Sequence, residues 1–281
     1  MSRTEVILTF AQYEIRRAIA RKKVLALVAF TVLLTVVLYY LLSMAGTTLI
    51  PTSAYPYIWI VDVFIVGPLF LNFTAILIAA GAMSEEYEQG TAELLLSKPV
   101  RRSDYFIGKF LGGYFLFLMI LALDVFLSLA SAFTFFGSQN GLGVIPGLFL
   151  AQAFASLVFF SIAFMLGELI RRSSLAYIFS SVVFFTSFIM SAFLGVIYTI
   201  SGKAIYKTVQ IYLPTAPASS LPIQSAFPSL PSYLSTLRFL TTTAIVPTIG
   251  LSIEILLTYT LIAVAIAAAY FLRADISRKL S

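Results

Sequence analysis

Six long hydrophobic runs alternate with short segments that hold nearly all of the charged residues in this 281-residue chain. A helix needs about 20 apolar residues to cross the hydrocarbon core of a bilayer. Each run reaches that length, so the pattern predicts six membrane-spanning helices. The runs are Val24–Met44, Val63–Met83, Phe110–Phe136, Val144–Gly167, Leu175–Ile200 and Val246–Leu272.

Composition agrees with this pattern. Hydrophobic residues make up 60% of the chain, charged residues only 11%, and the mean hydropathy is +1.00. A soluble domain has about 25% charged residues, so this chain lacks the polar surface of one. We therefore expect an all-α membrane protein. The sequence has no cysteine and no histidine, which excludes disulfides and argues against a metal or cofactor site in this chain.

Basic residues predict the orientation of the spans. Of the 18 Lys and Arg residues, 15 lie in the N-terminal segment, the second and fourth loops and the C-terminal tail 273–281. The alternate loops hold only Lys203, Lys207 and Arg238. The positive-inside rule then places both termini in the cytoplasm, as six spans require. The net charge of +6 thus describes topology, and we expect no nucleic-acid partner.

Residues 1–23 precede the first span and predict an amphipathic helix that does not cross the membrane. A basic amphipathic helix beside a span is expected to lie in the cytoplasmic interface of the bilayer. The alternative is a positive anchor that only sets topology. The apolar face would hold Ile7, Leu8, Ala11, Ile15, Ala18 and Ile19, and the polar face Glu5, Thr9, Gln12, Arg16 and Lys23.

The cytoplasmic loop 84–109 contains a short predicted helix. Gly90 can end the preceding helix, since glycine accepts the left-handed cap conformation. Thr91 can cap a new helix with Glu93 in its first turn. The exposed leucines Leu94–Leu96 then need a surface to bury against. They could pack on the interfacial helix of this chain or dock a soluble partner, and the pattern alone leaves both open.

The same loop resembles the motif of the ABC-2 family of membrane permeases. That motif reads Glu-x-Glu-x-Gly-Thr, then leucines, then Ser-x-Pro-Val-x-Arg, with Gly-Lys at the start of the third span. This chain matches it from Glu86 to Arg102 and again at Gly108-Lys109, over about 25 residues. The order of interfacial helix, six spans and long external segment is also similar. Ala92 departs from the pattern, which commonly has leucine there.

The resemblance implies the permease subunit of an ATP-driven ABC exporter in a prokaryotic plasma membrane. Two permeases, identical or homologous, would pair and dock two copies of a separate ATPase, where ATP and magnesium bind. This chain has no Gly-x-x-x-x-Gly-Lys-Ser/Thr phosphate loop of its own. The resemblance assigns ATPase docking and coupling to Glu86, Glu88, Gly90, Thr91, Glu93, Leu95, Pro99 and Arg101.

The external segment 201–245 precedes the last span and combines many prolines and serines with recurring apolar residues, without an acidic residue. A loose polar linker would not have this composition. We expect an ordered segment of short helices, broken at prolines, that partly re-enters the membrane. It could line a gate or exit, or form a cap without a role in transport.

Isolated polar residues inside the spans are candidates for the translocation path: Asn72, Asp124 and Glu254. Each carboxyl could instead be protonated and hydrogen-bonded to a neighbouring helix. Glu168 is expected to pair with Arg172 at a helix end. A rival function is a secondary transporter or channel that uses Asp124 and Glu254, but it leaves the motif unexplained. An intramembrane enzyme is a weaker hypothesis, because no two carboxylates have helical spacing within a span.

Overall fold

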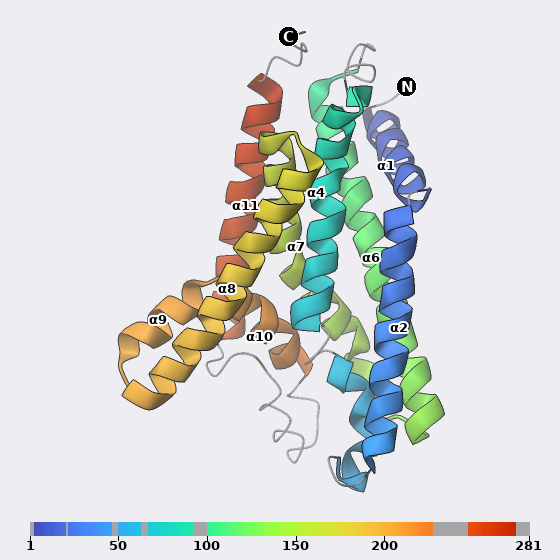
Figure 1. Cartoon of the computed structure of the whole chain (residues 1–281), viewed down its shortest axis with the longest axis vertical. Coiled ribbons are helices and arrows are strands. Elements are labelled where there is room, and N and C mark those ends of the chain that lie inside the picture. The colour runs from blue at the N-terminus through green and yellow to red at the C-terminus, as the bar shows by residue number, and fades with distance from the viewer. Residues whose placement is uncertain are drawn as a thin grey trace.

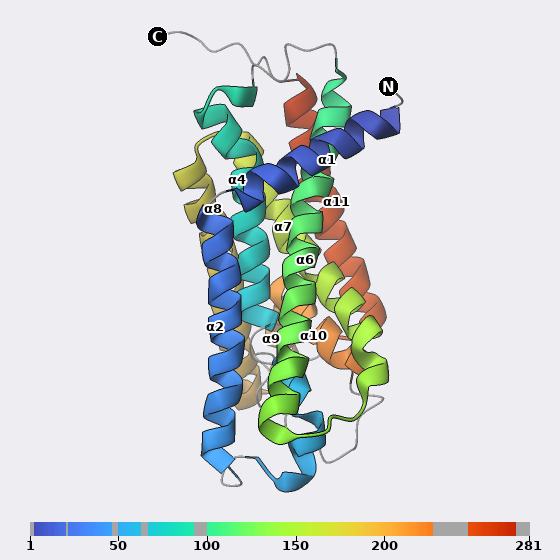
Figure 2. The same ribbon diagram turned by 90° about the vertical axis from the view of Figure 1, so that its right-hand side faces the viewer.

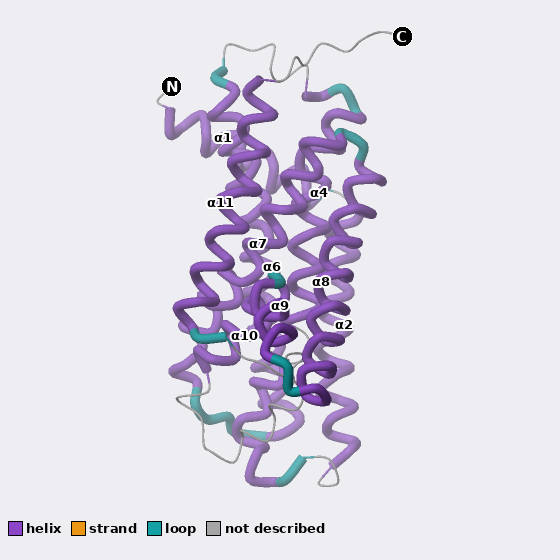
Figure 3. Tube along the Cα trace, turned by 90° about the vertical axis from the view of Figure 1, so that its left-hand side faces the viewer, coloured by secondary structure: helices purple, strands orange, loops and turns teal. Residues whose placement is uncertain are grey.

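The computed structural model describes residues 3–20, 22–46, 50–62, 67–92, 100–226 and 247–273. The regular structure of these residues is entirely helical, which confirms the all-α fold (Figure 3). Six of the helical segments in the described part are long and apolar enough to cross a membrane. They contain α2 (Lys22–Ala45), α4 (Asn72–Glu88), α6 (Arg102–Phe136), α7 (Ile145–Ile170), α8 (Ser173–Ser201) and α11 (Ile249–Arg273).

Helices α4 and α7 form the centre of the bundle, and α2 lies at its edge (Figures 1 and 2). In the most apolar stretch of the span that contains α4, 83% of the residues are buried. In the corresponding stretch of α2, 17% are buried. Small residues allow α4 and α7 to approach closely. A β-carbon at Gly167 would lie 2.6 Å from the Ala80 carbonyl oxygen, so only glycine fits there. Small residues serve this purpose at many helix contacts in membranes.

Helix α1 (Arg3–Ile19) crosses one end of the bundle and packs against α6 (Figure 2). We call this the α1 end. The contact depends on two glycines of α6, one turn apart. A β-carbon at Gly112 would lie 2.7 Å from the Ala11 carbonyl oxygen, and one at Gly108 would lie 2.5 Å from the Phe10 β-carbon.

The face of α1 that packs on the protein overlaps only in part with the expected apolar face. Leu8 and Ile19 were expected on one side with Ala18, yet they are 61% and 45% exposed. Glu14 and Ala18 are the buried residues of α1. The packed side is thus rotated toward Glu14, which has charged partners on α4 and α6.

The opposite end of the bundle holds the short helices η2 (Thr52–Ile60) and η4 (Leu142–Val144) and the turn η3 (Gly67–Leu71), which leads into α4. The described part of the external segment forms α9 (Ala204–Tyr212) and α10 (Thr215–Ala226). The break at Pro214 agrees with the prediction of helices broken at prolines, but Pro217 and Pro222 lie within α10. Helix α10 is buried against α7, α8 and α11 (Figure 1). The remainder of that segment, 227–246, lies outside the described residues.

Candidate functional site

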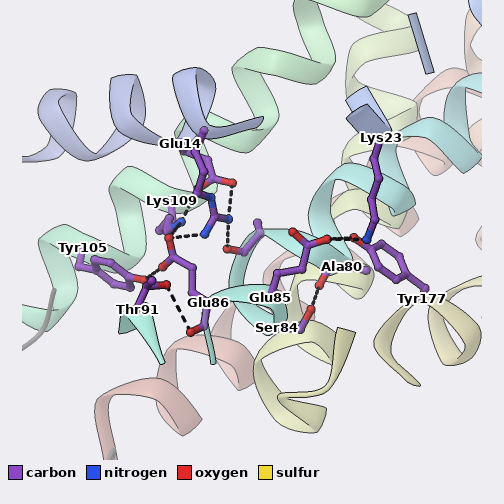
Figure 4. Close-up of polar contacts among 12 residues, drawn as sticks. Glu14, Lys23, Ala80, Ser84, Glu85, Glu86, Thr91, Tyr105, Lys109 and Tyr177 are labelled. Carbon is purple, nitrogen blue, oxygen red and sulfur yellow. Dashed lines mark hydrogen bonds and ion pairs between the residues drawn. The ribbon is translucent and has the colours of Figure 1, made fainter. Parts of the chain in front are cut away.

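A buried network of ion pairs joins three helices at the α1 end (Figure 4). Helix α1 contributes Glu14 and Arg17, and a guanidinium nitrogen of Arg17 lies 3.0 Å from a carboxylate oxygen of Glu14. The Lys109 ammonium group of α6 pairs with Glu14 and with Glu86 of α4, and Arg17 also pairs with Glu86. Lys109 and Glu86 are both 0% exposed. Two acidic and two basic groups therefore balance within the interior.

Further hydrogen bonds hold this network in place. The Tyr105 hydroxyl group of α6 donates to Glu86, and Arg17 donates to the Ala82 carbonyl oxygen at 2.9 Å. Buried charges are tolerated when they are paired and their remaining hydrogen-bonding groups are satisfied. Because removal of one partner leaves an uncompensated charge, the relative positions of α1, α4 and α6 are tightly specified here.

Glu85 precedes Glu86 and points to the other side of α4 (Figure 4). Its carboxylate accepts hydrogen bonds from Lys23 of α2 at 3.0 Å and from the Tyr177 hydroxyl of α8 at 2.5 Å. The Lys23 ammonium group also lies 4.9 Å from the centre of the Tyr177 ring. This second cluster joins α4 to α2 and α8.

Tyr87 joins α4 to α7. Its hydroxyl group lies 2.8 Å from both carboxylate oxygens of Glu168, and the Arg171 guanidinium group lies 4.7 Å from its ring centre. The prediction that Glu168 pairs with Arg172 was wrong, because the ion pair is made by Arg171 at 3.6 Å. Helix α7 ends at Ile170 and Arg171 takes a left-handed conformation with φ of 55°, so the two arginines do not continue the helical spacing.

Glu88 joins α4 to the start of α8. Its carboxylate accepts hydrogen bonds from the Ser173 backbone N–H at 2.9 Å and from the Ser173 hydroxyl at 2.5 Å. An acidic group at a helix N-terminus also interacts favourably with the helix dipole. Four consecutive residues, 85–88, thus contact α1, α2, α6, α7 and α8 between them. We call residues 85–88 the tether segment.

The predicted coupling residues fall into three groups. Glu86 is buried in the network, whereas Glu88 and Arg101 are exposed. Gly90 has φ of 69°, the left-handed conformation expected at the end of α4, and the Thr91 hydroxyl donates to the Glu86 carbonyl oxygen at 3.4 Å. The remaining three lie outside the described residues, and so does most of the predicted coupling helix: Glu93, Leu95 and Pro99.

Comparison with known protein families identifies the family of this chain. A family model described as "ABC-2 family transporter protein" matches residues 8–276. The chain belongs to the ABC-2 transporter family. It is therefore a multi-pass membrane permease of an ABC transporter, and members of this family generally work with a separate ATPase subunit.

A curated relative is "Uncharacterized protein YhcI" of Bacillus subtilis (strain 168). It is 30% identical to this chain over 135 residues. The alignment covers 39% of this chain and 43% of the relative, so the chain spans less than half of that protein's length.

Several residues of the buried network were not among the site residues predicted from the sequence. Glu14 and Arg17 of α1 and Tyr105 of α6 belong to this group. One signal was present for Glu14, because it lies three residues after Ala11 and four before Ala18, on the apolar side of the amphipathic pattern. Its partner could not be identified from spacing, since Lys109 is 95 residues away.

The polar residues predicted inside the spans lie in separate surroundings. Asn72 is buried on α4 and accepts a hydrogen bond from Ser156 of α7 at 2.8 Å. Asp124 is buried on α6 and accepts one from Thr35 of α2 at 3.0 Å. Glu254 is exposed on α11. No described hydrogen bond or ion pair joins these three residues.

A cavity of about 520 Å³ opens between α2 and the core helices α4, α6 and α8. Its wall is mostly apolar, from residues such as Leu27, Phe30 and Leu77. Glu14, Lys23 and Glu85 also line it, which places it beside both charged clusters.

Proposed function

We propose that this permease is the membrane subunit of an ATP-driven exporter, that it works as a pair of permease chains, and that each chain docks one copy of a separate ATPase. The observation that supports this proposal is the tether segment. It contains the Glu-x-Glu start of the ABC-2 motif, and it contacts five other helices at the α1 end.

This arrangement suits the transmission of a mechanical displacement. The ATPase would bind residues 93–101, with Glu93, Leu95, Pro99 and Arg101 as its contacts. Gly90 and Thr91 link that surface to α4, and the buried charges of Glu86 would resist being separated from α1 and α6. A push on the loop would therefore move the helices together rather than bend α4 alone.

In the proposed complex, the partner subunits would bind and hydrolyse ATP. ATP and magnesium would bind in the ATPase subunits, and this chain would supply the membrane path. We place the chain in a prokaryotic plasma membrane with both termini in the cytoplasm. Basic residues support this orientation, because 15 of the 18 Lys and Arg residues lie in the two terminal segments and in the second and fourth loops. Helix α1 would then lie in the cytoplasmic interface, and α9 and α10 on the external side as part of a gate or exit.

The test uses the permease co-expressed with the ATPase that co-purifies with it. Glu93→Arg combined with Leu95→Asp reverses a charge and removes an apolar contact in the loop. We expect the variant to insert and pair normally but to lose ATP-driven transport in reconstituted vesicles. Transport at the normal rate, or the absence of any co-purifying ATPase, would overturn the proposal. Transport driven by a pH gradient without ATP would favour a secondary transporter instead.

A further inference from the structure

Two carboxylic acids meet in the interior at the end of the bundle opposite α1. Asp62 follows η2, and Asp124 lies on α6. The two residues are 5% and 1% exposed, and their carboxyl groups hydrogen-bond to each other. The sequence offered no such pair, because the residues are on different segments. A hydrogen bond between two carboxyl groups requires a proton on one, since an ionised carboxylate only accepts.

The remaining negative charge of this pair has no compensating cation in the described part of the chain. The ion pairs there lie at the α1 end, and none includes Asp62 or Asp124. The Oδ1 atom of Asp62 is buried and has no hydrogen-bond partner among the described residues. A buried polar atom without a partner is costly, and an anionic one is more so. The unsatisfied oxygen therefore points to a positively charged ligand.

The surroundings of the pair provide oxygen atoms. Thr35 of α2 donates to Asp124 at 3.0 Å. The hydroxyl groups of Tyr39 on α2 and Ser128 on α6 lie 2.6 Å apart, and they reach the Trp59 carbonyl oxygen at 2.8 and 2.9 Å. Carboxylate, hydroxyl and carbonyl oxygens are ligands for hard cations. A carboxyl pair that shares one proton has a charge of minus one, which a monovalent cation neutralises.

We propose that Asp62 and Asp124 form a binding site for one monovalent cation, either a proton or an alkali metal ion. With one shared proton and the bound cation, the site is neutral and holds Asp62 against α6 and α2. When the cation leaves, the pair keeps one negative charge in the interior. Loss of the shared proton then ionises both carboxyl groups, and their mutual repulsion separates Asp62 from α6. Among the described residues, Tyr39 is a further titratable side chain that faces the pair. This site does not depend on the proposed role in ATP-driven export.

Trp59 gives the site a built-in reporter. It is the single tryptophan of the chain, its carbonyl oxygen accepts from Tyr39 and Ser128, and it lies three residues before Asp62. Fluorescence of the purified permease in lipid nanodiscs should therefore be recorded across a pH titration, in sodium chloride and in choline chloride. We expect one transition that is lost in Asp62→Asn and in Asp124→Asn and retained in the control Glu254→Gln, whose carboxyl group is exposed on α11.

The two salts distinguish the ligands. If sodium binds, it competes with protons and shifts the midpoint to lower pH than in choline. An equal midpoint in both salts identifies the proton as the ligand. A transition that persists in both Asn variants, or a wild-type fluorescence that responds to neither pH nor sodium, overturns the proposal. If the variants fail to insert, infrared absorption of the wild type decides, because the site requires a protonated carboxyl band that disappears across the same transition.

Discussion

The ammonium group of Lys109 on α6 bonds to the carboxylate of Glu86 on α4, and neither side chain is exposed. Both residues belong to the ABC-2 motif, at its Glu-x-Glu and Gly-Lys ends. The first glutamate of the motif thus has a partner within the permease itself. We infer that the start of the motif holds the helices together, while under the proposed function the residues that follow it contact the ATPase.

The buried network predicts a large effect of removing its central cation. Lys109→Met keeps the length of the side chain but leaves Glu14 and Glu86 without this partner. We expect a loss of about 3–5 kcal/mol of stability, typical of breaking a buried ion pair from one side. Thermal unfolding of the purified permease in detergent measures the effect.

The matched control is Lys23→Met in the neighbouring cluster. The Lys23 side chain is 66% exposed, so its ion pair with Glu85 is expected to contribute about 1 kcal/mol or less. Equal melting temperatures for Lys109→Met and the wild type would show that the buried pairs contribute no net stability.

The contact between α1 and α6 predicts a different effect for two glycines. Gly112→Ala places a methyl group within 2.7 Å of the Ala11 carbonyl oxygen, so α1 must move away. We expect a cost of about 1–3 kcal/mol from this overpacking. A cysteine introduced at Ala18, which is 7% exposed on α1, should then react faster with a thiol reagent. The chain has no native cysteine to interfere.

Gly147→Ala on α7 is the control for this substitution, because no atom lies within 4 Å of the added carbon. It should leave both the melting temperature and the reactivity at position 18 unchanged. If Gly112→Ala also leaves both measurements unchanged, the glycines of α6 do not determine where α1 packs.

The cap on α8 predicts an effect on coupling. Glu88→Ala removes the acceptor for the Ser173 backbone N–H and hydroxyl, at a cost of about 1 kcal/mol. Under the proposed function, we expect near-normal binding of the ATPase but fewer molecules transported per ATP hydrolysed. Vesicle transport and ATP hydrolysis should be measured together. An unchanged ratio would mean that the link from α4 to α8 does not transmit the displacement.

The proposed orientation predicts opposite accessibility at the two ends of the bundle. Ser138 and Gln89 are both exposed, the first between α6 and η4 and the second after α4. A cysteine at Ser138 should react with an impermeant reagent in intact cells. One at Gln89 should react only after permeabilisation. The reverse result would invert the orientation drawn from the basic residues.

The sequence by itself determined the membrane fold and the family of this protein. Apolar runs of spanning length are local properties, since the cost of placing charges in the bilayer does not depend on which helices are neighbours. Gly90 likewise ends α4 through its own backbone conformation. The family motif could be recognised because its residues are contiguous.

Only the tertiary structure decided which polar groups meet. Glu85, Glu86, Tyr87 and Glu88 are adjacent in sequence, yet helical geometry directs them toward different neighbours. Asp124 looked isolated until the structure placed Asp62 against it, 62 residues earlier in the chain. Periodicity shows which side of a helix is apolar, but the partner of a buried charge depends on how whole helices pack. That packing is set by close contacts such as Gly112 against Ala11.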